Sequence, residues 1–192
     1  MQNLALLKEV LAKSGEVQEG VYESLGEFVE LLYRWSGKLN LLSHADREKI
    51  VEKHLVPSIR LANVLRLVPH HRIVDFGSGA GLPGIPVKIL FPESSVVLVE
   101  SRRRRANYLK QVARFLKLEN IETVHGRLEE ISPKELQADV VISRAVLNQR
   151  ALVSVVEPYI RPGGALVCTS PTEERSIPKL MKVGEQPQVH LI

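Results

Sequence analysis

The 192-residue sequence is poor in cysteine and has no long hydrophobic segment. Its single cysteine, Cys168, excludes an internal disulfide and leaves no thiol cluster for a metal, so we expect no metal site. No apolar run approaches the roughly 20 residues that cross a bilayer, so we expect no association with a membrane. Lys8 and Glu9 interrupt the apolar stretch at the amino terminus, which argues against a secretion signal. These absences favour a protein of the cytoplasm.

Acidic residues are missing from one segment, although the whole chain is only mildly basic, with a net charge of +4. Between Arg102 and Lys117 there are seven Lys or Arg residues and no Asp or Glu. Such a segment attracts phosphates when it forms a helix, whereas a merely solvated charged face is the alternative. We predict that its basic side is a phosphate-binding face, formed by Arg103, Arg104, Lys110, Arg114 and Lys117.

Helical periodicity marks the first seventy residues. Apolar residues at alternating steps of four and three predict an amphipathic helix from Val21 to Trp35, with Trp35 in the helical core. Shorter helices are expected at Leu4–Leu11, at Asp46–Leu55 with Asp46 as the N-cap, and at Ile59–Leu65 beyond a break at Pro57. Residues 1–70 are therefore expected to form a helical region.

From residue 71 onward, short β-branched runs alternate with helical stretches. The expected strands are Ile73–Val74, Val96–Val99, Ile121–Val124, Val140–Ile142 and Ala165–Cys168, and the tail beyond Ser170 is expected to add edge strands at most. The expected helices are Ile85–Leu90, Arg103–Leu118 and Leu147–Tyr159. This alternation predicts an α/β fold for residues 71–192, with a mostly parallel sheet and helices on both faces.

A glycine-rich loop from Gly77 to Leu82 is the most informative segment of the chain. Glycines allow positive φ and a close approach of ligand to backbone. A loop that follows a parallel strand lies at the carboxyl edge of the sheet, where nucleotide-like ligands bind. The next apolar run ends in Glu100, which is placed to accept hydrogen bonds from both hydroxyls of a ribose. The pair indicates a site for an adenosine-containing cofactor, and a loop that only turns the chain is the alternative.

The spacing of the glycines separates two kinds of adenosine cofactor. Dinucleotide sites favour G-x-G-x-x-G. Here the spacing is G-x-G-x-G, and Leu82 stands at the third position of the dinucleotide pattern. Pro83 and Pro86 remove backbone N–H donors that a pyrophosphate would require. The loop therefore favours S-adenosylmethionine over a nicotinamide dinucleotide.

Longer motifs in the chain resemble a known family. They are Trp35–Leu41, His54, Val74–Pro86, Leu118–Asn120, Gly126–Glu130 and Ile142–Ala145. On these residues the chain, from about Phe28 to Cys168, resembles the bacterial 16S ribosomal RNA guanine-N7 methyltransferases, also called the glucose-inhibited division protein B family. The resemblance implies a Rossmann-like methyltransferase core, S-adenosylmethionine as the methyl donor, and 16S ribosomal RNA or the 30S subunit as the partner. We also expect the protein to be a monomer.

The resemblance implies cofactor contacts at Gly77, Leu82, Leu128, Glu129 and Arg144. With the loop and ribose arguments, the candidate cofactor-binding residues are Asp75, Gly77, Ser78, Gly79, Gly81, Leu82, Glu100, Ser101, Leu128, Glu129 and Arg144. Asp75 is either a support for the loop or a ligand of the cofactor's amine. The chain departs from the family at Pro57, where a carboxylate is usual, at Thr169, where a lysine is usual, and at Arg104-Arg105, where a Lys-Arg pair is usual.

The expected chemistry needs no general base, and no Ser/His/Asp or Cys/His set is evident in the sequence. Guanine N7 has a lone pair and no proton, so catalysis is expected to rest on orientation. Arg144 follows a strand and is expected at the cofactor edge, where its guanidinium would position a methionine carboxylate, an RNA phosphate or guanine O6. An ordinary surface charge is the alternative.

Three questions stay open at this point. Asn40 and His54 are equally compatible with a place in the cleft and with a structural place. The substrate is alternatively a small molecule or a protein. A non-enzymatic RNA-binding module is the remaining alternative.

Overall fold

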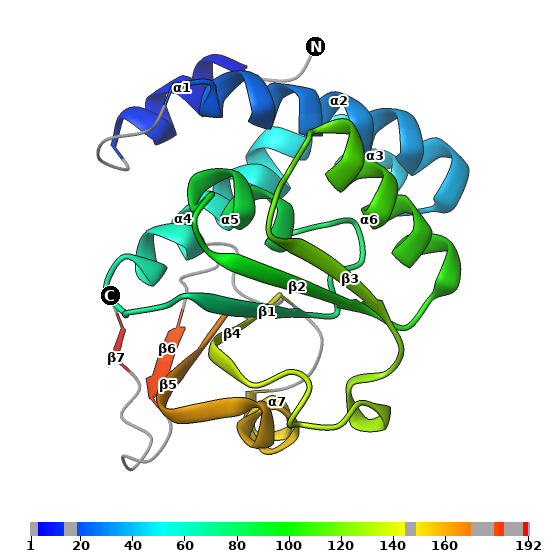
Figure 1. Ribbon diagram of the computed structural model, residues 1–192. Helices are drawn as coiled ribbons and strands as arrows, with labels where there is room; N and C mark the ends of the chain where they lie inside the picture. The colour runs from blue at the N-terminus through cyan, green and yellow to red at the C-terminus, as the bar shows by residue number, and fades with distance from the viewer. Residues whose placement is uncertain (1–3, 14–18, 145–148, 170–178, 183–189, 192) are drawn as a thin grey trace.

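A seven-stranded sheet runs through the computed structural model, which describes residues 4–13, 19–144, 149–169, 179–182 and 190–191 (Figure 1). The strand order is β3-β2-β1-β4-β5-β6-β7. The first five strands are parallel, and β6 and β7 are antiparallel to their neighbours. The expected α/β fold with a mostly parallel sheet is therefore confirmed.

Each of the five expected strands is present and extends beyond its β-branched run. Their bounds are β1 Arg72–Phe76, β2 Ser95–Glu100, β3 Ile121–His125, β4 Ala138–Arg144 and β5 Ile160–Thr169. The tail adds β6 (Lys179–Lys182) and β7 (His190–Leu191) at one edge. The chain moves outward from β1 to β3 and then returns to β4 on the other side of β1. The carboxyl ends of β1 and β4 therefore form a topological switch point, where ligands of such sheets bind.

Two unequal layers cover the sheet, one above it and one below it in Figure 1. The thicker layer contains α1 (Leu4–Ala12), α2 (Val21–Leu39), α4 (Val56–Leu65), α5 (Gly84–Leu90) and α6 (Arg103–Phe115). The thinner layer is α7 (Gln149–Val156) with two 3-10 turns, η2 (Leu128–Glu130) and η3 (Glu157–Tyr159). Alternate strand residues supply the two cores, since Leu98 packs with the thicker layer and Val97 with the thinner one.

The amino-terminal helices share a core with the sheet. Phe28 and Leu32 of α2 are fully buried in the same hydrophobic cluster as Ile73 of β1 and Leu109 of α6. Trp35 packs against this cluster as expected, with its ring centroid 5.8 Å from that of Tyr108. The expected division after residue 70 falls in the loop between α4 and β1 and stays a prediction.

Two expectations about the segment before α4 are wrong. The N-cap of α3 (His44–Arg47) is Ser43, whose hydroxyl accepts a hydrogen bond from the backbone N–H of Asp46 at 3.1 Å. The helix also does not break at Pro57, because a π-helical turn, η1 (Val51–Leu55), runs directly into α4. Proline lacks an N–H and its ring clashes with the carbonyl four residues earlier, and the wider turn just before it accommodates both effects.

Among the described residues, no helix combines the length and apolar composition needed to cross a bilayer. The same part of the chain has no group of three or more His, Cys, Asp or Glu side chains that could hold a metal ion.

Candidate cofactor and nucleic-acid site

The glycine-rich loop leaves β1 at the switch point and is fixed on both sides. Gly77, Gly79 and Gly81 have φ angles of 77°, 51° and 86°, which only glycine adopts readily. The N–H groups of Gly77 and Ser78 each donate to the carbonyl of Val99 in β2 at 3.0 Å. From β4, the Ser143 hydroxyl donates to the carbonyl of Phe76 at 3.1 Å. The neighbouring strands therefore hold the start of the loop in place.

The far side of the loop packs against helices. A Cβ at Gly81 would lie 2.9 Å from Ile85 of α5, 3.2 Å from Leu109 of α6 and 3.5 Å from the ring of Phe28. Gly81 thus needs to be glycine for space as well as for its φ angle. The amino-terminal helix α2, through Phe28, is part of the scaffold beneath the loop.

The carboxylate of Glu100 joins the loop to the start of α6. It is buried at the end of β2, with 5% of the residue exposed. Its Oε2 accepts the N–H of Gly79 at 2.9 Å, and its Oε1 accepts the N–H of Arg102 at 2.7 Å. A carboxylate has about four acceptor positions, so each oxygen can still accept from a ribose hydroxyl. Glu100 thus contacts the glycine loop directly, and its expected role at a ribose stays a prediction.

Asp75 is fully buried beneath the same loop. Its Oδ2 accepts the N–H of Gly84 at 3.0 Å, whereas its Oδ1 has no partner among the described residues. Burial raises the pKa of this carboxyl to about 7, although the hydrogen bond from Gly84 and the charge of Arg144 oppose the change. Asp75 therefore supports the loop and also retains one buried acceptor.

Arg144 is held by the amino-terminal helices. At the end of β4, its Nη1 donates to the carbonyl of His54 at 3.0 Å, and its Nη2 donates to Nδ1 of the same histidine at 2.6 Å. Burial and the charge of Arg144 lower the pKa of His54 to about 4. The neutral ring then accepts at Nδ1 and has its proton on Nε2, which is buried and has no hydrogen-bond partner among the described residues. His54 thus contacts a candidate site residue directly.

The remaining candidate cofactor-binding residues differ in how far they are buried. The N–H of Gly126 donates to the carbonyl of Glu100 at 3.1 Å, which brings the segment before η2 beside β2. Leu128 is buried on the α7 side of the sheet, and Leu82 is buried on the helical side. Glu129 and Ser101 are exposed.

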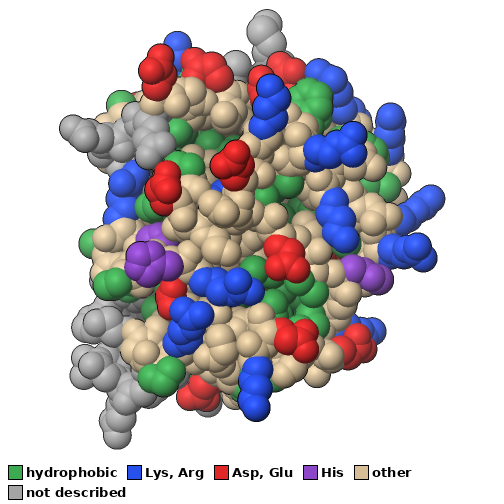
Figure 2. Space-filling model, viewed as in Figure 1, with side chains coloured by type: hydrophobic (Ala, Val, Ile, Leu, Met, Phe, Trp, Pro, Cys, Tyr) green, Lys and Arg blue, Asp and Glu red, His purple; other side chains and the backbone are tan. Residues whose placement is uncertain are grey.

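The residues predicted to form the basic face are exposed. Arg103, Arg104, Lys110 and Arg114 lie on α6, and Lys117 lies just beyond its end at Phe115. Leu109 and Val112, on the opposite side of the helix, are buried against the sheet. Lys and Arg side chains gather along the right-hand margin of Figure 2, over α6 and the neighbouring end of α2.

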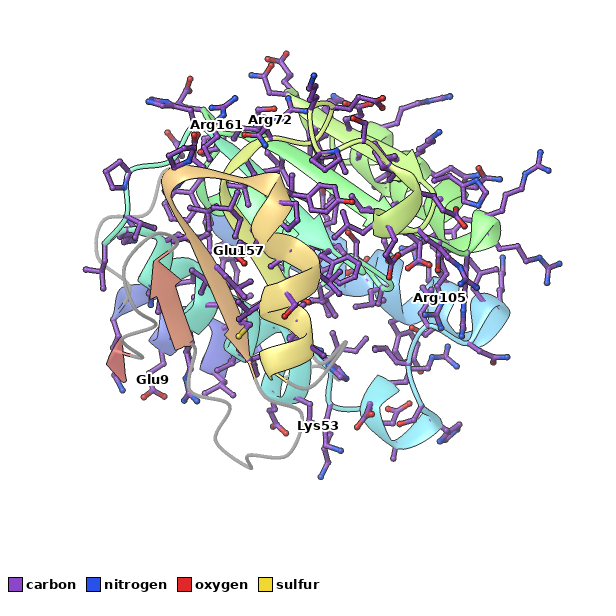
Figure 3. All side chains as sticks on the ribbon, turned by 90° about the horizontal axis from the view of Figure 1, so that it is seen from below. Glu9, Lys53, Arg72, Arg105, Glu157 and Arg161 are labelled. Atoms are coloured by element: carbon purple, nitrogen blue, oxygen red, sulfur yellow. The ribbon has the colours of Figure 1, made fainter. Side chains whose placement is uncertain are left out.

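Sequence reasoning missed Arg105 as a site residue. Its Nη2 donates to the carbonyl of Asn40 at 3.0 Å, and its Nη1 lies 3.8 Å from where a Cβ of Gly79 would be. Figure 3 shows Arg105 beside the end of α2, where Asn40 forms the C-cap with a φ of 48°. Arg105 therefore links the glycine loop to the amino-terminal helices. Helical spacing contained a signal, since Arg105 lies on another side of α6 than Arg103, Lys110 and Arg114.

A sequence profile described as rRNA small subunit methyltransferase G, that of the GidB family, matches residues 21–176 of this chain. The chain belongs to the GidB family. A Clostridium tetani protein named ribosomal RNA small subunit methyltransferase G is 38% identical over 152 residues, which are 78% of this chain and 64% of the relative. A protein of the same name from Alkaliphilus metalliredigens is 31% identical over 172 residues, or 88% and 72% of the two chains. The GidB chain described here thus spans less than two thirds of the Clostridium tetani protein.

Solved structures show the same fold at low identity. One is a Plasmodium falciparum protein assigned as a protein-L-isoaspartate O-methyltransferase, in complex with S-adenosyl-L-homocysteine. It has a TM-score of 0.61 and 18% identity, and the match covers 100% of this chain and 94% of that one. Another protein-L-isoaspartate O-methyltransferase has a TM-score of 0.56 and 17% identity, over 71% of this chain and 44% of that one. These similarities confirm the Rossmann-like methyltransferase fold.

Proposed function

We propose that this GidB-family chain transfers a methyl group from S-adenosylmethionine to N7 of a guanine in 16S ribosomal RNA. The observation that supports it most is the family match, because residues 21–176 include the glycine loop, Glu100, the basic helix and Arg144. We further propose that it acts as a monomer in the cytoplasm, without a metal, on the free RNA or the 30S subunit.

The residues at the carboxyl edge fit an adenosyl methyl donor. S-adenosylmethionine supplies a methyl group that is already activated by the positive sulfur. Glu100 is placed to accept the two ribose hydroxyls, because among the described residues each of its oxygens accepts a single backbone N–H. The buried Oδ1 of Asp75 is an acceptor suited to an amine N–H. Gly79 keeps the part of the loop beside Glu100 free of a side chain, since a Cβ there would lie 3.9 Å from the Glu100 carboxylate.

The proposed mechanism is one of orientation. Because guanine N7 has no proton, no residue of the chain needs to act as a base, and alignment alone contributes roughly 7–11 kcal/mol in favourable cases. Arg144 is the positioning residue that we favour. A guanidinium has five N–H groups, so its contacts with His54 and Ser58 leave donors for a carboxylate, a phosphate or guanine O6.

The basic face of α6 supports an RNA substrate. A small molecule or a protein would not require four exposed cations along one acid-free helix. The helix also begins beside Glu100, because Arg102, its N-cap, donates to that carboxylate. RNA on this face would therefore extend away from the methyl donor.

The cofactor half of the proposal is tested by thermal shift with S-adenosylhomocysteine. We expect stabilisation of the wild type that grows with ligand concentration. Glu100→Gln retains an acceptor for Gly79 but loses the charge, and we expect at least about tenfold weaker binding because charged hydrogen bonds contribute about 1.5–3 kcal/mol each. Glu122→Gln, at an exposed position of β3, is the matched control and should bind like the wild type. Equal affinity of Glu100→Gln and wild type would contradict the proposed ribose site.

The RNA half is tested by transfer of labelled methyl groups to 30S particles and to protein-free 16S RNA, followed by nucleoside analysis. We expect label in 7-methylguanosine with at least one of the two substrates. Label in another nucleoside, or in ribosomal protein only, would refute this assignment.

A further inference from the structure

One aromatic side chain differs from all the others in its exposure. The four Phe, four Tyr and one Trp of the chain all lie among the described residues. Eight of the nine are buried or half-buried, whereas Phe115 is 61% exposed. Leu67, after α4, is the other large apolar residue of comparable exposure in the described chain. Phe115 belongs to neither hydrophobic core cluster.

The exposed side of α6 that includes Phe115 otherwise contains polar groups of two kinds. Four are cations and two are side-chain amides, and all are exposed: Arg103, Arg104, Asn107, Lys110, Gln111 and Arg114. At about 100° per residue, these six and Phe115 form one continuous stripe. Gln111 precedes Phe115 by one helical turn, so their side chains are neighbours. The stripe thus combines cations, amides and one aromatic ring, with no carboxylate.

This combination matches the chemistry of a single-stranded RNA. Cations bind phosphates, amides bind base edges, and aromatic rings stack on unpaired bases. We propose that Phe115 stacks on an unpaired base of the RNA and that α6 therefore recognises a single-stranded or looped segment. The inference rests on the proposed RNA substrate and adds to it the structural class of the segment that the helix binds.

Phe115 is placed to anchor the RNA at a distance from the methyl donor. It lies twelve residues after Arg103, and at about 1.5 Å per residue this is roughly 18 Å along the helix. The helix is rigidly mounted, because Tyr108, Leu109 and Val112 are buried on its inner side. A stack at Phe115 is therefore expected to contribute to RNA affinity and not to the rate of the methyl-transfer step.

The test compares three substitutions of Phe115 in binding to protein-free 16S RNA. Phe115→Ala removes the ring and Phe115→Leu keeps an apolar side chain, and both are expected to bind about fivefold to 100-fold more weakly. Phe115→Tyr keeps a stacking ring and should bind like the wild type. Leu67→Ala is the matched control, since it removes a similarly exposed apolar side chain away from α6. Phe115→Trp adds a direct observation, because bound RNA should quench the fluorescence of the new tryptophan. The wild type, in which Trp35 is the one tryptophan, gives the background signal for this comparison.

Salt dependence separates stacking from charge. Arg114→Gln is expected to reduce the slope of log affinity against log salt by about 0.7, the value for one phosphate contact on a single strand. Phe115→Ala should lower affinity equally at every salt concentration and leave this slope unchanged. The single-turnover rate at saturating protein should be the same in Phe115→Ala and wild type.

The outcomes distinguish this inference from the proposed function. If Phe115→Leu binds RNA as tightly as wild type, the ring is not stacked and the inference is wrong, even when methyl transfer to RNA is intact. Weaker binding of 30S particles but unchanged binding of protein-free RNA would assign Phe115 to a protein contact and also overturn it. If the wild type transfers no methyl group to RNA, the proposed function fails instead.

Discussion

Two buried titratable residues at the site shift in directions with opposite effects on stability. Asp75 has its pKa raised to about 7 by burial, so between about pH 4 and 7 the folded state holds a proton that the unfolded state releases. His54 has its pKa lowered to about 4 by burial and by Arg144, so between about pH 4 and 6.5 the unfolded state holds the extra proton. Rising pH therefore lowers stability through Asp75 and raises it through His54.

Single substitutions should reveal these two opposed contributions. Relative to His54→Gln, the wild type should gain about 3 kcal/mol of unfolding free energy from pH 4 to 6.5. Relative to Asp75→Asn, the wild type should lose a similar amount, on the order of a few kcal/mol, from pH 4 to 7. Urea denaturation at several pH values measures both differences. Parallel profiles of the wild type and either variant would show that the corresponding group is not shifted in the folded state.

At the scale of residues, the sequence predicted that Glu100 ends a strand near the glycine loop but not the partners of the charged groups. Glu100 was recognisable because it ends a strand at a fixed distance from the glycine loop. Arg144 and His54 are 90 positions apart in the sequence. Their contact could not be predicted because no local sequence pattern relates the two residues. Arg105 stands in a run of four arginines. Helical spacing places it on another side of α6 than Arg103, but the packing of the helix decides which side faces the glycine loop.

At the scale of elements, α6 ends in a Schellman motif with an unusual residue. The N–H of Leu118 donates to the carbonyl of Ala113 at 2.9 Å, and the N–H of Lys117 donates to that of Arg114 at 3.2 Å. Lys117 therefore occupies the left-handed position, with a φ of 52°, where glycine is usual. A side chain there costs about 1 kcal/mol.

Replacement of Lys117 should separate its structural cost from its charge. Lys117→Gly is expected to raise the unfolding free energy by about 1 kcal/mol, because glycine adopts positive φ without strain. Lys117→Gln, the matched control, removes the same charge but keeps the strain, so its stability should equal that of the wild type. If Lys117 contacts phosphate, both variants should lose the same RNA affinity. A destabilised glycine variant would contradict the strain at this position.

Elements with regular periodicity were predictable, and the irregular ones were not. The 3.6-residue period located α2 and α6, and β-branched runs located all five parallel strands. The π turn before Pro57 was missed, because the sequence contains a proline that usually ends a helix and no signal for the wider turn that accommodates it. Ser43 was missed as an N-cap because Asp46, three residues later, is also a common capping residue.

At the scale of the whole molecule, the amino-terminal helices and the sheet are expected to unfold together. Phe28 of α2 is fully buried, and its ring lies 3.5 Å from the Cβ position of Gly81 in the glycine loop. The sequence predicted an amphipathic helix here but not which surface its apolar side covers, since that depends on contacts distant in the chain.

Phe28→Ala tests this shared core. We expect a loss of about 3–5 kcal/mol of unfolding free energy, as for other buried phenylalanines, together with weaker binding of S-adenosylhomocysteine because the loop loses its support. Leu67→Ala, at an exposed position, should change stability by less than about 0.5 kcal/mol. Far-UV circular dichroism and Trp35 fluorescence should report one coincident transition. Two separate transitions would show that the helical region folds independently of the sheet.

The double engagement of Glu100 has a thermodynamic consequence. The carboxylate accepts hydrogen bonds from Gly79 in the loop and from Arg102 at the start of α6. A ligand that donates hydrogen bonds to the same oxygens would therefore affect the position of both segments. If the methyl donor binds Glu100 and nucleic acid binds α6 as proposed, we expect the two binding events to be coupled through this side chain. Such coupling is reciprocal. If the bound donor raises the affinity for nucleic acid by some factor, bound nucleic acid raises the affinity for the donor by the same factor.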